Sequence, residues 1–410
     1  MVIDSLGVGQ MDDVAAVRFQ DTGANTLKHV SEFYNDYRLP ILESLGAGYI
    51  ADSKNITKVE RVRGSYGCSN LAHEGADTYQ GHQEIVGSKP RQPLIKPFKS
   101  CIEKVRETLI KAGYSVVIPE QDHPFLLVNN LVTIADNIEA DLGLNYNVTA
   151  PLDYISFAEE LDIGNIVRNN VEVGRVIVLG GRGISVENIL DAVEIIPPDF
   201  VGINCPKSGV YKSGYMVRHL GYGINPSRQL PTILINSGYK VSLIGKAADV
   251  INCEGADYIP AVDTASVLQL ILDQMAEQQN GLIMANVQET DLAGHAENVG
   301  TYAAKLKITD RFIGEIMAKM QDDDLLFITG DHGNDPTIGH SHHTREKAFL
   351  IVYGKKINNV YLGERKTLAD IGASIADYFG VSRPEFGESF WGMLRKSISP
   401  AVLQLGTLLH

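Results

Sequence analysis

Short apolar runs alternate with longer amphipathic stretches through the second half of the chain. Residues 281–287, 325–329 and 348–353 are rich in strand-forming apolar side chains, which predicts buried strands. Residues 301–320 and 367–379 place apolar side chains at helical spacing, and Gly380 ends the second stretch. This alternation predicts an α/β fold whose mostly parallel sheet is flanked by helices.

A proline-rich segment marks a candidate domain boundary. Pro90, Pro93 and Pro97 interrupt the regular pattern, and helix and strand signals then resume up to about residue 222. We therefore predict a smaller α/β domain inserted into a larger one. The expected bounds are 97–222 for the insert and 1–96 with 223–410 for the core.

Composition narrows the class of protein. The chain has 410 residues and a formal net charge of −14, which argues against a nucleic-acid partner. No apolar stretch approaches the roughly 20 residues of a membrane span, and the first residues do not resemble a signal peptide. The four cysteines show no CxxC spacing. A soluble cytoplasmic protein is the expectation.

Acidic and histidine side chains follow several of the apolar runs. They are Asp4, Asp291, His295, Asp331, His332 and His343. Because the loops after parallel strands meet at one sheet edge, we expect these groups to converge there. Six such groups exceed what one metal takes while leaving room for substrate, so two divalent ions are predicted. Mixed carboxylate and imidazole ligands favour Mn²⁺ or Zn²⁺.

Three further residues suggest contacts with substrate or phosphate. Thr78 stands at a predicted loop-to-helix junction, where it either caps the helix or acts as a nucleophile. Lys246 ends a predicted strand and is suited to binding phosphate. Asp136 follows an apolar run, and an ordinary surface charge is the alternative for it.

Several segments together resemble the phosphopentomutase family of the alkaline phosphatase superfamily. They include Asp4-Ser5-Leu6-Gly7, Asp77-Thr78-Tyr79-Gln80-Gly81-His82, Gly245-Lys246-Ala247-Ala248-Asp249 and Asp331-His332-Gly333-Asn334-Asp335-Pro336, with His343-Thr344-Arg345-Glu346. They occur in family order along nearly the whole chain, and the block that begins at Asp331 is the most specific. The resemblance implies an alkaline-phosphatase-like core interrupted by a cap domain.

The resemblance also assigns expected roles. Asp4, Asp331, His332 and the Thr78 oxygen would hold one Mn²⁺, and Asp291, His295 and His343 the other, with Zn²⁺ or Mg²⁺ as alternative ions. Thr78 would carry the phosphate, a sugar bisphosphate would activate the enzyme, and Asp136, Lys246 and Arg218 would contact substrate. The implied reaction is isomerisation of ribose 1-phosphate to ribose 5-phosphate through a phosphothreonine enzyme.

Departures from the family pattern keep other functions open. Ala76 and Gln83 replace a lysine and a tryptophan beside the threonine, and Asp291 and His295 are four positions apart instead of five. The alternatives are a mutase for another phosphorylated small molecule, a phosphatase or phosphodiesterase of the same superfamily, and a metal-dependent binding protein. The sequence leaves the oligomeric state open.

Overall fold

The computed structural model describes residues 1–139, 142–277 and 280–397. The chain divides into two compact units, Met1–Pro90 with Asn225–His410 and Arg91–Ile224. The sequence predicted an insert over 97–222. Residues 398–410, at the end of the predicted core, lie outside the described residues. Among the helices that are described, none is both long and apolar enough to cross a membrane.

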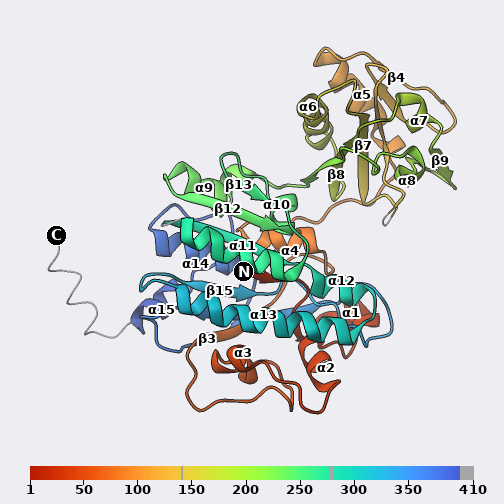
Figure 1. Ribbon diagram of the computed structural model, residues 1–410. Coiled ribbons are helices and arrows are strands. Elements are labelled where there is room, and N and C mark those ends of the chain that lie inside the picture. Colours follow the sequence, from red (N-terminus) through yellow and green to blue (C-terminus); the bar gives the residue numbers. More distant parts are fainter. Residues whose placement is uncertain (140–141, 278–279, 398–410) are drawn as a thin grey trace. The chain divides into compact units, whose positions relative to one another are not determined.

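The larger unit is built on a mixed sheet (Figure 1). Its first five strands in spatial order run parallel, and β16 is antiparallel to its neighbours. The order is β13 (Asp257–Ile259), β12 (Lys240–Gly245), β14 (Gly281–Val287), β1 (Val2–Ile3), β15 (Leu326–Thr329), β16 (Glu346–Tyr353), β3 (Ser65–Ser69) and β17 (Tyr361–Arg365), with β2 (Gly7–Gln10) paired to β16.

Helices flank this sheet on both faces. Those in the larger unit are α1 (Val14–Val17), α2 (Thr26–Glu32), α3 (Pro40–Ser44), α4 (Thr78–Ile85), α9 (Leu230–Asn236), α10 (Lys246–Val250), α11 (Thr264–Glu277), α12 (Glu289–His295), α13 (Val299–Lys319), α14 (Ala369–Phe379) and α15 (Trp391–Lys396). The predicted strands and helices of this unit are confirmed as β14, β15, β16, α13 and α14, with ends shifted by a few residues.

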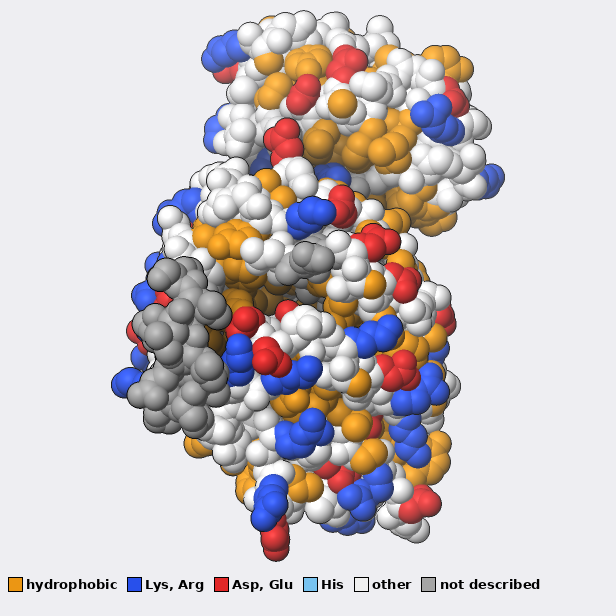
Figure 2. Space-filling model, turned by 60° about the vertical axis from the view of Figure 1, so that its left-hand side comes forward, with side chains coloured by type: hydrophobic (Ala, Val, Ile, Leu, Met, Phe, Trp, Pro, Cys, Tyr) orange, Lys and Arg blue, Asp and Glu red, His pale blue; other side chains and the backbone are white. Residues whose placement is uncertain are grey.

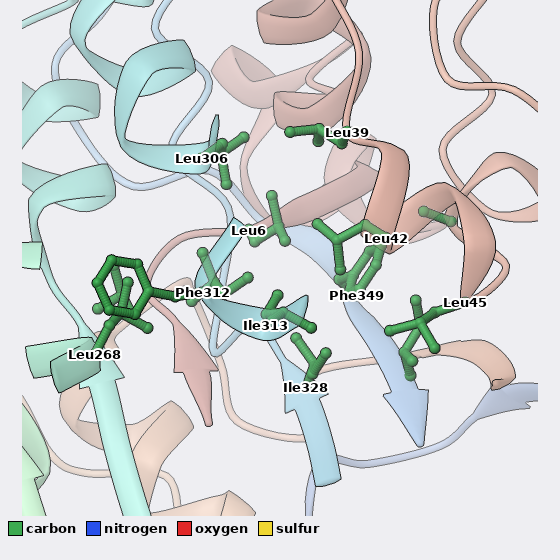
Figure 3. Close-up of a cluster of buried hydrophobic side chains, with 14 of the residues drawn as sticks. Leu6, Leu39, Leu42, Leu45, Leu268, Leu306, Phe312, Ile313, Ile328 and Phe349 are labelled. Carbon is green, nitrogen blue, oxygen red and sulfur yellow. The ribbon is translucent and has the colours of Figure 1, made fainter. Parts of the chain in front are cut away.

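Two hydrophobic cores hold the helices to the sheet. Along β16, Phe349 and Ile351 belong to the core formed with α3, α11 and α13, whereas Leu350 and Val352 belong to the core formed with α9, α14 and α15. Figure 3 shows Phe349 and Ile328 of the sheet among leucines and isoleucines of the covering helices. β16 is thus buried on both faces because helices cover both sides of this mixed sheet.

The second unit has its own sheet and core. Its strand order is β11 (Met216–Gly221), β8 (Arg175–Gly181), β7 (Asn145–Pro151), β6 (Val132–Asp136), β10 (Phe200–Ile203) and β9 (Val193–Ile196), with β5 (Leu126–Val128) paired to β6 and β4 (Val116–Val117) paired to β5. Its helices are α5 (Ile102–Lys111), α6 (Phe157–Arg168), α7 (Val186–Leu190) and α8 (Cys205–Ser208). This is the α/β architecture that the sequence predicted for the insert.

Acidic and basic side chains are interspersed on the face of the larger unit that Figure 2 shows. Among the described residues, no single acidic area covers that face, although the net charge of the chain is −14. The buried carboxylates described next contribute to this charge.

Candidate active site

Three neighbouring parallel strands present the acidic and histidine side chains at one edge of the larger sheet. Asp4 follows β1, Asp331 and His332 follow β15, and Asp291 lies on α12, directly after β14. Because β14, β1 and β15 pair side by side in parallel, their carboxyl ends meet at this edge. The larger unit alone thus brings together residues that lie 327 positions apart in the sequence, as with Asp4 and Asp331.

Asp4, Asp331 and His332 form the first candidate metal site, and all three are buried. The Nε2 atom of His332 lies 3.4 Å from Asp4 Oδ1 and 3.3 Å from Asp331 Oδ2. His332 Nδ1 donates to the Gly333 carbonyl at 2.9 Å, which leaves Nε2 to face the carboxylates. Asp4 Oδ1 and His332 Nε2 are buried without a hydrogen-bond partner among the described residues. Both atoms are therefore suited to be ligands of the same cation.

Asp291, His295 and His343 form the second candidate metal site. The sequence predicted Asp291 and His295 in a loop past a strand, but both lie on helix α12, where residues four apart share one face. His295 Nε2 lies 3.4 Å from Asp291 Oδ2, and His343 Nε2 lies 3.3 Å from Asp291 Oδ1. Each histidine donates from Nδ1 to a backbone carbonyl, Ser341 O and Ala76 O, both at 2.7 Å.

The electrostatics keep the carboxylates ionised. Burial would raise the pKa of Asp291, but hydrogen bonds from His295 and His343 hold it well below its usual range. Burial alone would lower the pKa of His332, but the neighbouring carboxylates of Asp331 and Asp4 outweigh this effect and raise the pKa to about 10. A site that attracts protons this strongly also attracts divalent cations, which displace those protons on binding. The two groups of ligands therefore support a site for two divalent metal ions.

Thr78 and Lys246 lie between the two groups. Thr78 is the first residue of α4, and its Oγ1 donates to Asp331 Oδ2 at 2.8 Å. Lys246, the first residue of α10, places Nζ 3.0 Å from Thr78 Oγ1, 2.7 Å from Asp4 Oδ2 and 3.6 Å from Asp291 Oδ2. Burial lowers the pKa of Lys246, but these carboxylates raise it above its usual value, so the ammonium is charged. The geometry suits binding of an anion at Thr78.

Three supporting residues were not found from the sequence. Nδ1 of His82 lies 2.9 Å from Thr78 O and 3.1 Å from Asp331 Oδ2, and Nδ2 of Asn334 donates to Asp291 Oδ1 at 3.0 Å. Nδ2 of Asn286 donates to Asp4 Oδ2 at 2.7 Å. An asparagine within an apolar strand was the available signal for Asn286, because a buried amide needs a partner.

The residues that depart from the family pattern have defined places. The Ala76 carbonyl accepts the hydrogen bond from His343 described above. The Gln83 side chain is buried, and its amide donates to the Val250 carbonyl and accepts from Gln229 Nε2.

Two predicted substrate contacts belong to the second unit. Asp136 is buried at the end of β6, and its carboxylate accepts hydrogen bonds from the backbone N–H groups of Phe98 and Val201. Burial raises the pKa of Asp136 to about 6. This gives Asp136 a structural role within its unit. Arg218 lies on β11 and is partly exposed. Substrate contact by either residue stays a prediction.

Known proteins match this chain along most of its length. A family model described as the Metalloenzyme superfamily matches residues 1–383. The phosphopentomutase of Acetivibrio thermocellus is 31% identical over an alignment of 411 positions, and the alignment covers 96% of this chain and 98% of that protein. That of Symbiobacterium thermophilum is 31% identical over 415 residues, covering 97% of this chain and 98% of that protein.

Among solved structures, a phosphoglycerate mutase of Leishmania mexicana, determined at low cobalt concentration, is 11% identical with a TM-score of 0.47. That match covers 95% of this chain and 96% of the other. The sequence matches decide the family. The chain belongs to the metalloenzyme superfamily and, within it, to the phosphopentomutases, which makes it an isomerase of the phosphomutase type.

Proposed function

We propose that this enzyme interconverts ribose 1-phosphate and ribose 5-phosphate through a phosphorylated Thr78. The names of the relatives supply the substrate class. The observation that carries the mechanism is the place of the Thr78 hydroxyl, 2.8 Å from Asp331 Oδ2 and 3.0 Å from Lys246 Nζ. A nucleophile needs both activation and a charged group that binds the transferring phosphate, and this hydroxyl has neighbours suited to both.

The residues present define how two divalent ions would be held. Asp4, Asp331, His332 and the Thr78 oxygen would hold one, and Asp291, His295 and His343 the other. Mn²⁺ is the proposed ion, because it accepts mixed carboxylate and imidazole ligands. Bound there, such ions would lower the pKa of the Thr78 hydroxyl and neutralise charge on the transferring phosphate.

Residues of this chain perform the remaining tasks. Lys246 binds the phosphate as a point charge, and the backbone N–H groups of the first turn of α4 bind its oxygens. Asp77 fixes the start of that helix, since its side chain accepts from the Gln80 N–H at 2.9 Å. The Thr78 phosphate then passes to the free hydroxyl of a sugar monophosphate, and the resulting bisphosphate returns its other phosphate to Thr78. A sugar bisphosphate would phosphorylate the resting enzyme.

An isomerisation assay tests this proposal. The Mn²⁺-loaded enzyme is primed with a sugar 1,6-bisphosphate and given ribose 1-phosphate, and the products are followed by ³¹P NMR. The proposal expects ribose 5-phosphate to accumulate with little free phosphate, and Thr78→Val to abolish conversion. Stoichiometric release of free phosphate would instead identify a phosphatase, and conversion by Thr78→Val would exclude the phosphothreonine.

A further inference from the structure

A buried amide joins the two short helices that begin at Thr78 and Lys246. Gln83 lies on α4, five residues after Thr78, and its Nε2 donates to the Val250 carbonyl at 2.6 Å. Val250 is the last residue of α10, which starts at Lys246. One hydrogen bond therefore links the ends of two helices whose first residues are themselves 3.0 Å apart at Thr78 Oγ1 and Lys246 Nζ.

A second glutamine fixes the orientation of this amide. Nε2 of Gln229 donates to Gln83 Oε1 at 2.6 Å and to Ser88 Oγ at 2.8 Å. Turning the Gln83 amide over would place its oxygen against the Val250 carbonyl and its nitrogen against the Gln229 nitrogen. Both contacts would then be repulsive, so the network has one stable arrangement. Gln83 and Gln229 are both almost fully buried, which makes each of these bonds costly to lose.

The same network anchors the chain where it leaves and re-enters the larger unit. The first segment of the larger unit ends at Pro90, and its second segment begins at Asn225. Ser88 lies two residues before Pro90, and Gln229 lies four residues after Asn225. The two segments are also joined by the Leu230 N–H, which donates to the Val86 carbonyl at 2.9 Å. The Gln83–Gln229 pair is thus held at a fixed place in the larger unit.

We propose that Gln83 and Gln229 are positioning residues that set the alignment of Thr78 with Lys246. Helices of eight and five residues have little stability of their own, so contacts at their far ends decide where their first residues lie. Without the Gln83 amide, α4 and α10 lose a fixed hydrogen bond between them, and Thr78 Oγ1 and Lys246 Nζ separate. This inference rests on the proposed function, in which the two groups act on the same phosphate.

The test uses three variants of the full-length, Mn²⁺-loaded enzyme. Gln83→Met removes the amide but keeps the side-chain length, Gln229→Met removes only its partner, and the double variant removes both. Gln274→Met is the matched control, because Gln274 accepts a hydrogen bond from Ser242 Oγ at 2.7 Å on α11, away from Thr78. The measurements are the rate of Thr78 phosphorylation, kcat, KM, bound Mn²⁺, the melting temperature and the crystallographic Thr78–Lys246 distance.

The expected result separates positioning from stability. Gln83→Met lowers kcat at least about tenfold, with KM within about twofold and two Mn²⁺ still bound, because a small misplacement of reacting groups is costly. The Thr78–Lys246 distance lengthens beyond hydrogen-bond range. The double variant regains part of the melting temperature that Gln83→Met loses, because it leaves no buried Gln229 amide without its partner. Its kcat nevertheless stays low. Gln274→Met leaves kcat unchanged.

Recovery of kcat together with melting temperature in the double variant would overturn the inference, as would an unchanged Thr78–Lys246 distance in Gln83→Met. If Gln83→Met does not fold, Gln229→Met decides by the same criteria. Failure of the proposed function has a different signature: the wild-type enzyme shows no phosphate on Thr78. In that case the crystallographic distances still test the positioning role.

Discussion

The Nε2 atoms of His295 and His343 face each other at 3.0 Å. Each ring donates from Nδ1 to a backbone carbonyl, so in the neutral tautomers both Nε2 lone pairs point toward one another and toward the Asp291 carboxylate. Such an arrangement is repulsive unless a proton or a cation lies between the nitrogens. Holding imidazoles in one tautomer through carbonyl acceptors is the usual way in which proteins prepare histidines as metal ligands.

Replacing one of these histidines should remove one metal ion. We expect His343→Ala to lower bound Mn²⁺ from two to one per chain, because Asp4, Asp331 and His332 are left intact. Metal analysis of the dialysed protein measures this. His342→Ala is the control, since His342 is the exposed neighbour of His343. Two Mn²⁺ bound to His343→Ala would contradict the assignment.

Metal removal should destabilise the fold. A ligand that binds only the folded state adds about 2.7 kcal/mol at a free concentration one hundred times its Kd. We therefore expect the melting temperature to fall by several degrees when EDTA strips the protein and to recover with added Mn²⁺. Differential scanning calorimetry checks this. A melting temperature that EDTA leaves unchanged would show that the buried carboxylates are balanced by Lys246 and the histidines alone.

Glycine at position 81 should be required for the approach of α4 to Asp331. A Cβ atom at Gly81 would lie 2.5 Å from the Asp331 carbonyl oxygen, a backbone atom that cannot move aside easily. We expect Gly81→Ala to destabilise the protein by roughly 1–3 kcal/mol and to reduce phosphorylation of Thr78. Gly392→Ala is the matched control, because Gly392 is also helical and a Cβ there meets nothing within 4 Å. Urea unfolding of the two variants should therefore differ clearly.

Lys246 should matter for rate more than for metal content. We expect Lys246→Met to lower kcat about a hundredfold or more, because the fixed charge beside the transferring phosphate is lost. Bound Mn²⁺ should stay at two per chain. Lys356→Met, which removes a partly exposed lysine paired with Asp323, should leave kcat unchanged. Wild-type kcat in Lys246→Met would exclude Lys246 from phosphate binding.

The second unit should lose stability as the pH rises. Glu160 is fully buried on α6, and burial raises its pKa to about 8, an effect that the backbone of Leu179 offsets only in part. In the unfolded chain this carboxyl ionises near pH 4.3, so between about pH 4.3 and 8 the folded state alone keeps the proton. The stabilising contribution of the protonated Glu160 is complete below about pH 4.3. As the pH rises from about 4.3 to about 8, the free energy of unfolding falls by at most about 1.4 kcal/mol per pH unit. Glu160→Met should therefore stabilise the protein at pH 8.5 more than at pH 5, which thermal melts at the two pH values compare.

The ligand groups were accessible to sequence reasoning for a clear physical reason. Asp4, Asp331 and His332 directly follow buried strands, and parallel strands bring such positions to one edge whatever the intervening sequence. Asp291 and His295 were predicted because they come just past the apolar run at residues 281–287. The sequence did not show that they lie on a helix, because seven residues after a strand carry too short a pattern to distinguish α12 from a loop.

Contacts between distant side chains could not be predicted in this way. The Gln83–Gln229 bond joins residues 146 positions apart. Gln83 departs from the family pattern, but nothing in the sequence links it to Gln229. His82 was visible within a motif, but its contact with Asp331 depends on the packing of α4 against that strand end. The backbone N–H groups that bond to Asp136 within its own unit could not be predicted either, and contact of Asp136 with substrate stays a prediction.

The most direct test of the account is the chemical state of Thr78 during turnover. Mn²⁺-loaded enzyme is incubated with a sugar 1,6-bisphosphate whose phosphates carry ¹⁸O, and its peptides are mapped by mass spectrometry before and after a chase with unlabelled ribose 1-phosphate. The account predicts labelled phosphate on Thr78 before the chase, which passes to the pentose and is replaced by unlabelled phosphate as ribose 5-phosphate forms. Turnover of ribose 1-phosphate by an enzyme that never carries phosphate on Thr78 would contradict it.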